Sequence, residues 1–566
     1  MKRKSRIKQV KTGNMSRNTL IIIIIVVLFF IVGGYFLTKT MVDQMKEFSN
    51  NSGTSEGNYG DMLVDSSTGD ASFLNPILAG DSASGDICGL VFNGLVKYDK
   101  DIKLVGDLAE NWDISEDGLI ITFHLRKNVE WHDGVPFTAK DVEFTFKKLT
   151  DPLTKSPYKS NYEIVKKAEV IDDYTFRVTY SEPFAPALES WGMGILPRHI
   201  LEGKDINTAD FNRNPMGTGP YKFKSWDAMQ KITVDSYSGY FEGRPFIDKY
   251  MCRIIPDQSV QFLELKSGGL DTMVLTPDMF TNQTDSGDFK SKFNKYQYPA
   301  FMYTYMGFNL LSPLFKERKV RQAIAYAINK KDIIDNIMLG LGREATGPFP
   351  PESWAYNSRV ESTPYDIEIS KILLKAEGWV DSDNDGVLEK NGKKFEFMLM
   401  TNHGNKVRQQ IAEIIQQQLK KIGIKVEVRI IAWSAFINEY VDKKKFDAVV
   451  LGWSLGRDPD CYDIFHSSKT KEKEYNFVSY NNPEIDKLLI EGRKTFDMEK
   501  RKRIYFKIHE MLAKDMPYVF LYVPDSLSAY DNRISGIKIA PAGISYNFIK
   551  WFVPEGRQKY RNVLQQ

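Results

Sequence analysis

The sequence is poor in the side chains from which compact catalytic and metal sites are usually built. Its three cysteines, Cys88, Cys252 and Cys461, are too few and too scattered for a disulfide framework or a CxxC metal site. Its six histidines are widely separated, and none of them pair at metal-ligand spacing. The nucleophile elbow GxSxG, the phosphate loop GxxxxGK(S/T), HExxH and GxGxxG after a strand are all missing. We therefore expect neither an enzyme nor a cofactor.

Excess charge of one sign is missing from most of the chain. The formal net charge is +3, but residues 1–58 hold nine of the 76 basic residues and only three of the 73 acidic ones. The remaining chain therefore has 67 basic and 70 acidic residues, a net charge of −3. This balance offers no basic surface for nucleic acid, so we exclude a nucleic-acid partner.

One long apolar run lies near the N-terminus. Residues 20–37 contain no charged side chain and would span ~27 Å as a helix, close to the thickness of the bilayer's hydrocarbon core. Seven basic residues precede this run, which by the positive-inside rule places the N-terminus in the cytoplasm. The sequence thus predicts a single-pass membrane protein with a cytoplasmic basic tail (1–18), a transmembrane anchor (19–38) and a flexible tether (39–58) before an extracellular domain. A cleaved signal peptide is the alternative, but no small-x-small site follows the run.

Alternating strand and helix patterns after the tether predict an α/β fold. The length of 566 residues is more than one hydrophobic core usually holds, so we expect at least two lobes. The clearest pattern is β-α-β-α-β. Its predicted elements are strand 395–401, a helix from Val407 to Ile422, strand 424–431, a helix over 434–443 and strand 446–453.

The loop after the last of these strands is a candidate ligand site. Units of this kind build parallel sheets, and ligands of open parallel sheets bind beyond the carboxyl ends of the strands. The loop has the sequence SLGRDPD and covers residues 454–460. A rigid turn whose Asp side chains cap local amides is the alternative interpretation.

A second acidic loop resembles the first half of a calcium-binding loop. Asp381, Asp383 and Asp385 have the spacing of calcium ligands, but the position that needs a bidentate acid is Gly392. The strand that follows indicates a hairpin tip, in which the Asp side chains cap turn amides. We prefer this interpretation and keep these three residues as a weak metal candidate.

A series of motifs identifies the family that the chain resembles. The motifs are LAENWDISEDG (108–118), FHLRKNVEWHDGVPFTAKDV (123–142), DPLTKSPY (151–158), GTGPYKFKSW (217–226), GFNL (307–310), KVRQAIAYAINKKDII (319–334), AEGWVDSDNDG (376–386) and SYNNPEIDKLL (479–489). They occur in the order typical of the oligopeptide- and dipeptide-binding class of extracellular solute-binding proteins, across residues 59–566. The resemblance implies a receptor that captures peptides for an ABC-type importer.

The resemblance also implies an architecture. It is a periplasmic-binding-protein-like clamp of two lobes with an extra subdomain, and a peptide lies extended between the lobes. Lobe I would be discontinuous, and lobe II would contain the β-α-β-α-β unit. The implied ranges are 59–97, 210–309 and 527–566 for lobe I, 98–209 for the extra subdomain and 310–526 for lobe II.

Four aromatic residues resemble those that line the family's ligand cleft: Tyr158, Trp433, Trp453 and Tyr522. Each of them has an alternative interpretation as partly buried packing.

The loop 454–460 departs from the family's pattern. Similar peptide receptors carry an Asp a few residues after the Trp, and this Asp pairs with the ligand's α-ammonium group. Here Gly456 or Arg457 stands at the expected position. Asp458, or else Asp460, would replace the missing Asp if the loop is shifted, whereas Arg457 would instead meet a carboxylate.

Three classes of function follow. The first is a peptide receptor with an ABC permease and ATPase as partners and a monomeric ectodomain. The second is a receptor of the same fold for another solute, such as a nickel complex or a sugar. The third is an anchored peptide sensor or chaperone without an importer. The length and side-chain preference of a peptide ligand do not follow from the sequence.

Overall fold

The structure, a computed structural model, describes residues 59–561. The predicted tail, anchor and tether fall within residues 1–58 and lie outside the described residues. No helix within residues 59–561 is long and apolar enough to cross a membrane.

Lobe I is built on a four-stranded sheet with the order β1-β10-β9-β8, in which β1 and β10 are parallel. Helix α2 packs against β8, and its buried face adds Ile87 and Val91 to the core. The Asp81 carboxylate starts this helix by accepting the Ser84 N–H at 3.0 Å. The elements of lobe I are β1 (Met62–Ser67), α2 (Ser82–Val91), β8 (Tyr221–Asp227), β9 (Lys231–Ser236), β10 (Lys249–Ile254), α6 (Gln258–Ser267), β11 (Thr272–Val274), α7 (Gly287–Lys292) and β12 (Phe293–Pro299).

The predicted extra subdomain contains an antiparallel sheet with the order β4-β5-β7-β6. The Asp141 carboxylate accepts the Thr138 N–H at 2.9 Å at the start of α3. Buried Trp191 lies in one continuous hydrophobic core that includes residues of lobe I, so the subdomain and lobe I form a single packed body. The elements are β2 (Val96–Tyr98), β3 (Leu104–Gly106), β4 (Ala109–Ile114), β5 (Ile120–Leu125), α3 (Ala139–Thr150), β6 (Val165–Asp172), β7 (Thr175–Tyr180), α4 (Ala187–Ser190) and α5 (Arg198–Leu201).

Lobe II contains the predicted β-α-β-α-β unit. Its strands β17, β18 and β19 are parallel, and α11 packs on them through Ile411, Ile415 and Leu419. The second predicted helix begins as α12 and continues as a π-helix over Phe436–Val441. The elements are β13 (Met302–Phe308), α8 (Arg318–Ala327), α9 (Lys330–Asp332), β14 (Gly342–Glu344), α10 (Ile367–Ala376), β15 (Glu389–Lys390), β16 (Lys393–Lys394), β17 (Glu396–Asn402), α11 (Lys406–Lys420), β18 (Lys425–Ile431), α12 (Trp433–Ala435), β19 (Ala448–Ser454), α13 (Tyr462–Phe465), α14 (Pro483–Lys494), α15 (Met498–Asp515) and β20 (Tyr518–Asp531).

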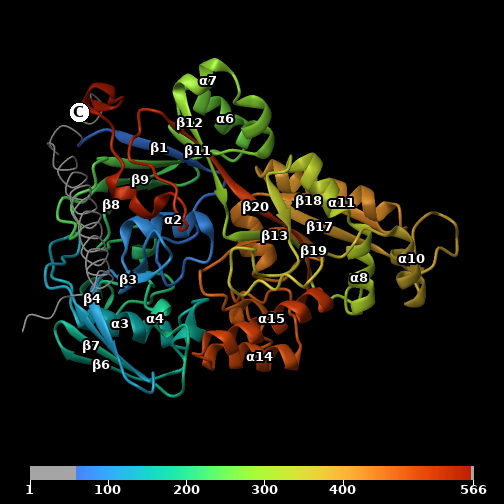
Figure 1. The fold of residues 1–566 in the computed structure, drawn as a ribbon, viewed down its shortest axis with the longest axis horizontal. Coiled ribbons are helices and arrows are strands. Elements are labelled where there is room, and N and C mark those ends of the chain that lie inside the picture. Colours follow the sequence, from blue (N-terminus) through green and yellow to red (C-terminus); the bar gives the residue numbers. More distant parts are fainter. Residues whose placement is uncertain (1–58, 562–566) are drawn as a thin grey trace, which may run out of the picture. The chain divides into compact units, whose positions relative to one another are not determined.

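Strand β20 belongs to both lobes (Figure 1). Its first part pairs with β13 in lobe II, and from Asp525 onward it pairs with β12 in lobe I. The chain therefore crosses between the lobes near Tyr522–Asp525 and near Pro299–Met302. By its pairing with β19, β13 lies in the sheet of lobe II, although the predicted range of lobe I extended to residue 309. Two adjacent strand crossings are a suitable hinge for opening and closing the lobes.

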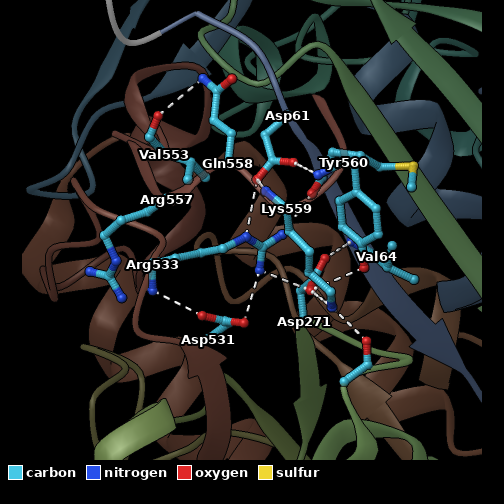
Figure 2. A network of polar contacts seen from close by, with 12 residues as sticks. Asp61, Val64, Asp271, Asp531, Arg533, Val553, Arg557, Gln558, Lys559 and Tyr560 are labelled. Atoms are coloured by element: carbon cyan, nitrogen blue, oxygen red, sulfur yellow. Dashed lines mark hydrogen bonds and ion pairs between the residues drawn. The ribbon is translucent and has the colours of Figure 1, made fainter. Parts of the chain in front are cut away.

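A buried ion-pair network joins distant parts of lobe I (Figure 2). The Arg533 guanidinium donates to Asp61 at 3.0 Å and to Asp271 at 2.9 Å. Lys559 also pairs with Asp271 at 3.0 Å, and the Tyr560 N–H donates to Asp61 at 2.8 Å. The Asp61 and Asp271 carboxylates are fully buried, so each depends on these partners for its charge to be tolerated. The network fixes the first strand of the lobe to its C-terminal segment.

Candidate ligand-binding site

The loop 454–460 lies against the extra subdomain and the C-terminal segment of lobe I. Arg457 donates to the Ala542 carbonyl oxygen at 3.3 Å, and its guanidinium lies 4.3 Å from the centre of the Phe301 ring. A Cβ built on Gly456 would lie 3.5 Å from the Glu189 Oε1 of α4. The strand end predicted as a ligand site therefore meets the facing lobe.

Asp458 forms a bidentate pair with Arg501 of α15. The two guanidinium nitrogens donate to its two carboxylate oxygens at 2.6 and 2.7 Å. Arg501 also donates to the Gly492 carbonyl oxygen at 2.9 Å. Burial raises the pKa of Asp458, and the bonds from Arg501 oppose this shift. An α-ammonium group at Asp458 would have to share a carboxylate whose two oxygens are already bonded, so ligand binding by Asp458 stays a prediction.

Asp460 has an arginine partner of its own. Arg493 of α14 donates to its carboxylate at 2.7 and 2.8 Å, and the same guanidinium lies 3.9 Å from the centre of the Tyr462 ring. Arg493 also donates to the Asn161 side chain of the extra subdomain at 3.1 Å. Asp460 thus takes part in a junction between lobe II and the subdomain, and its role in ligand binding stays a prediction as well.

Trp433 contacts lobe I directly. A Cβ built on Gly69 would lie 2.5 Å from the Trp433 ring, so only glycine permits this approach. The Trp433 Nε1, the Ser66 Oγ and the Ser72 Oγ are buried and have no hydrogen-bond partner among the described residues. Buried polar groups in folded proteins are nearly always satisfied by protein atoms, ordered water or a ligand, so these three atoms are available to water or to a polar ligand.

The other three predicted aromatics lie in different surroundings. Trp453 is partly buried, packs against Tyr475 and Phe477, and donates from Nε1 to the Tyr518 hydroxyl at 3.3 Å. Tyr158 donates to the Ala79 carbonyl oxygen at 2.5 Å, which joins the subdomain to lobe I.

Tyr522 is a core residue. Its side chain is 4% exposed and packs in the core of lobe II, where β20 lies between β13 and β14. Its predicted role in lining the ligand cleft stays a prediction.

A cavity of about 720 Å³ lies near loop 454–460, and no sequence motif pointed to it. It is lined by parts of α2, β2, α4 and the C-terminal segment of lobe I, and none of the seven predicted ligand-binding residues lines it. Two lining residues, Tyr98 and Glu189, are the ones that face loop 454–460. A glutamate in the apolar stretch FAPALESW was the only local signal that could have drawn attention to Glu189.

The acidic loop 381–389 has the hydrogen bonds of a capped turn. The Asp381 carboxylate accepts the Gly386 N–H at 3.0 Å, and Asp385 accepts the Val387 N–H at 3.0 Å. Lys394 pairs with Asp385 and lies 3.6 Å from Asp383. The three carboxylates offer oxygens within 4.8 Å of one another, but turn capping and a lysine already account for them. Metal binding here stays a prediction.

Two α/β lobes, joined by paired strand crossings and in contact where the Trp433 ring meets Gly69, have the architecture of a two-lobed solute-binding protein. The chain belongs to the bacterial extracellular solute-binding proteins, family 5, whose middle region matches residues 103–476. The resemblance read from the sequence motifs is confirmed.

The chain is similar to several proteins with described ligands. The oligopeptide-binding protein AppA of Bacillus subtilis is 37% identical over 510 residues, which cover 87% of this chain and 92% of AppA. The structure of AppA with a nonapeptide matches with a TM-score of 0.84 and 35% identity, over 88% of this chain and 100% of that one. DppA from Helicobacter pylori with the peptide STSA matches with a TM-score of 0.80 and 28% identity, over 88% of this chain and 99% of that one. NikZ from Campylobacter jejuni with Ni(L-His) matches with a TM-score of 0.80 and 29% identity, over 87% of this chain and 99% of that one.

Proposed function

We propose that this protein captures peptides outside the cell and delivers them to an ABC-type importer. The observation that carries the proposal is the contact between the lobes at Trp433 and Gly69, where a Cβ on Gly69 would lie 2.5 Å from the Trp433 ring. The similarity to peptide-bound AppA over nearly the whole described chain supports a peptide as the ligand. Catalysis has no part in this function.

Capture would work by closure of the two lobes. A ligand held between lobes shifts the protein toward the closed state only by as much as it binds that state better than the open one. A receptor for many peptides draws affinity from backbone amides and termini, which every peptide shares, and leaves side chains in tolerant pockets. The end of β1, the segment that follows it and the loop after β19 are backbone segments suitable for such contacts.

Mass spectrometry and calorimetry test the proposal together. Native mass spectrometry of the purified protein identifies any copurifying ligand, and calorimetry with a synthetic nonapeptide measures binding directly. We expect saturable binding of the nonapeptide. If only non-peptide solutes copurify and the nonapeptide does not bind, peptide capture is wrong.

The location is part of the proposal. Residues 19–38 would anchor the protein, with residues 59–566 exposed outside as a monomeric receptor that meets the permease and ATPase. N-terminal sequencing of protein extracted from membranes tests the anchor. A mature chain that begins near residue 40 would show that the segment is cleaved.

A nickel complex is the second candidate ligand, because NikZ with Ni(L-His) matches with the same TM-score as the peptide-bound DppA structure. Titration with Ni(L-His) against the nonapeptide separates the two candidates. A sugar or another small solute would appear in the mass spectra. The absence of permease and ATPase genes near this one would favour an anchored sensor or chaperone.

A further inference from the structure

Glu189 occupies the region where the family's ammonium-binding Asp is missing. It lies on α4 of the extra subdomain, and its Oε1 faces Gly456, one of the two residues at the expected Asp position. Burial and the Asp458 carboxylate raise the pKa of the Glu189 carboxyl group, whereas the Tyr98 side chain and the Asp458 backbone lower it. A carboxyl group from another element therefore lies beside the loop position, Gly456, at which the loop has no acid of its own.

Within residues 59–561, Glu189 forms no salt bridge, whereas its acidic neighbours Asp458 and Asp460 do. Asp458 and Asp460 are paired with arginines of α15 and α14. Among the residues that the structure describes, the charged groups that act most strongly on Glu189 are these two carboxylates. Arg457, the nearby cation, donates to the Ala542 carbonyl oxygen and lies over the Phe301 ring; it interacts with Glu189 through its charge, but within residues 59–561 the two side chains form no salt bridge. Burial raises the pKa of Glu189 to about 7, and the neighbouring Asp458 and Asp460 carboxylates add to this shift.

The cavity beside Glu189 has the size and lining for an amine-bearing group. Its volume of about 720 Å³ is in the range of small-ligand sites, ~300–1,000 Å³. Aromatic side chains such as Tyr98 and Trp551 line it, and their ring faces favour cations. The lining also includes Asp65 and Asp86, while its lysine, Lys97, is already paired with acidic residues of the cavity. The cavity thus offers more carboxyl groups than cations.

We propose that Glu189, in the lining of this cavity, binds a protonated amine of the ligand, either the α-ammonium group of a peptide or the side chain of a lysine. This inference rests on the proposed function and specifies which chemical group the site selects. Glu189 supplies the charge, and Tyr98 with the neighbouring aromatic rings supplies the cavity wall. The two sources of the amine share one chemistry, and defined peptides separate them.

The test compares Glu189→Gln with wild type and with Glu202→Gln, a surface control in the same subdomain, where Glu202 pairs only with exposed Arg198. The probes are three nonapeptides of Ala, Ser and Gly: one with a free N-terminus, one that is N-acetylated, and one that is N-acetylated with a central lysine. Calorimetry on the full-length protein gives the affinities. Circular dichroism checks that each variant is folded.

We expect wild type and Glu202→Gln to bind at least one amine-bearing nonapeptide about tenfold or more tightly than the neutral acetylated one. In Glu189→Gln this preference should disappear, with affinity for the neutral nonapeptide retained. If Glu189→Gln loses the preference for the nonapeptide with a free N-terminus, the group that Glu189 binds is the α-ammonium group. If it loses the preference for the lysine-containing nonapeptide, the group is the lysine side chain. Equal binding of all three by wild type, or a preference that survives in Glu189→Gln, overturns the inference while peptide binding stands. If wild type binds none of the three, the proposed function fails, and this inference fails with it.

Discussion

The substitution Asp458→Asn tests whether this residue acts on the fold or on the ligand. The change keeps the shape of the side chain but removes the charge that both Arg501 nitrogens contact at 2.6 and 2.7 Å. The Arg501 side chain is only 5% exposed, so its guanidinium would remain buried without a counter-charge. Breaking a buried pair in this way costs ~3–5 kcal/mol, whereas loss of an exposed pair costs less than ~1 kcal/mol.

Urea denaturation measures the first effect and calorimetry the second. We expect Asp458→Asn to lower the free energy of unfolding by ~3–5 kcal/mol, and the double variant with Arg501→Met to recover most of this loss, since both charges are then removed. Asp173→Asn, which breaks the exposed pair with Lys140, is the matched control. Unchanged stability in Asp458→Asn, together with a tenfold weaker affinity for a free N-terminus but not for an acetylated one, would refute the structural role. Asp458 would then be the ammonium anchor.

Three further outcomes follow from other parts of the fold. Gly69→Ala places a methyl group 2.5 Å from the Trp433 ring, so we expect it to hinder closure of the lobes. Small-angle scattering should then show a smaller decrease in radius of gyration when ligand binds. The control Gly287→Ala, which has open space around the new methyl group, should behave as wild type. His509 is fully buried, and burial lowers its pKa to about 4. Because the unfolded chain takes up a proton at this residue near pH 6.5 and the folded protein does not, up to ~3 kcal/mol of the free energy of unfolding is lost as the pH falls from 6.5 toward 4. His509→Gln should therefore flatten the stability profile in this interval in pH-dependent urea titrations; an unchanged slope would show that other groups cause it. Arg533→Met should cost ~3–5 kcal/mol in urea unfolding, because it leaves buried carboxylates without their main cation, and a loss below ~1 kcal/mol would contradict this.

The secondary structure of lobe II could be predicted from the sequence because its signals are local. Apolar spacing of 3.6 residues over Val407 to Ile422 and the apolar strand before Trp453 each depend on neighbours in the chain. The structure has these elements with ends within a few residues of those predicted. Local patterns do not reveal which other segment a strand pairs with. For this reason β13 was predicted in lobe I, although it pairs with β19 in lobe II.

The charged contacts of the site could not be predicted for the same reason. The partners of Asp458 and Asp460 lie 43 and 33 residues further along the chain, on helices whose arginines have no distinguishing pattern. Tyr522 was open to two interpretations because the strand around it is buried on both faces, so alternation does not mark a ligand-facing side. The sequence around Glu189 gave little indication of its position, because Glu189 lies beside Gly456 only in the folded protein, where the subdomain packs against lobe II.

The two arginine pairs have a consequence for how ligand selectivity could change. Arg501 and Arg493 hold both Asp side chains of loop 454–460 against α15 and α14, which fixes the backbone between Trp453 and Cys461. If the loop contacts a bound peptide, as proposed, its fixed backbone presents the same geometry to every peptide, so it would contribute affinity but little discrimination. Discrimination by charge would then fall to groups of the opposite body, lobe I with its subdomain, which contact the loop in this structure. Because such groups bind better in the closed state than in the open one, each favourable charge contact there strengthens both selectivity and closure.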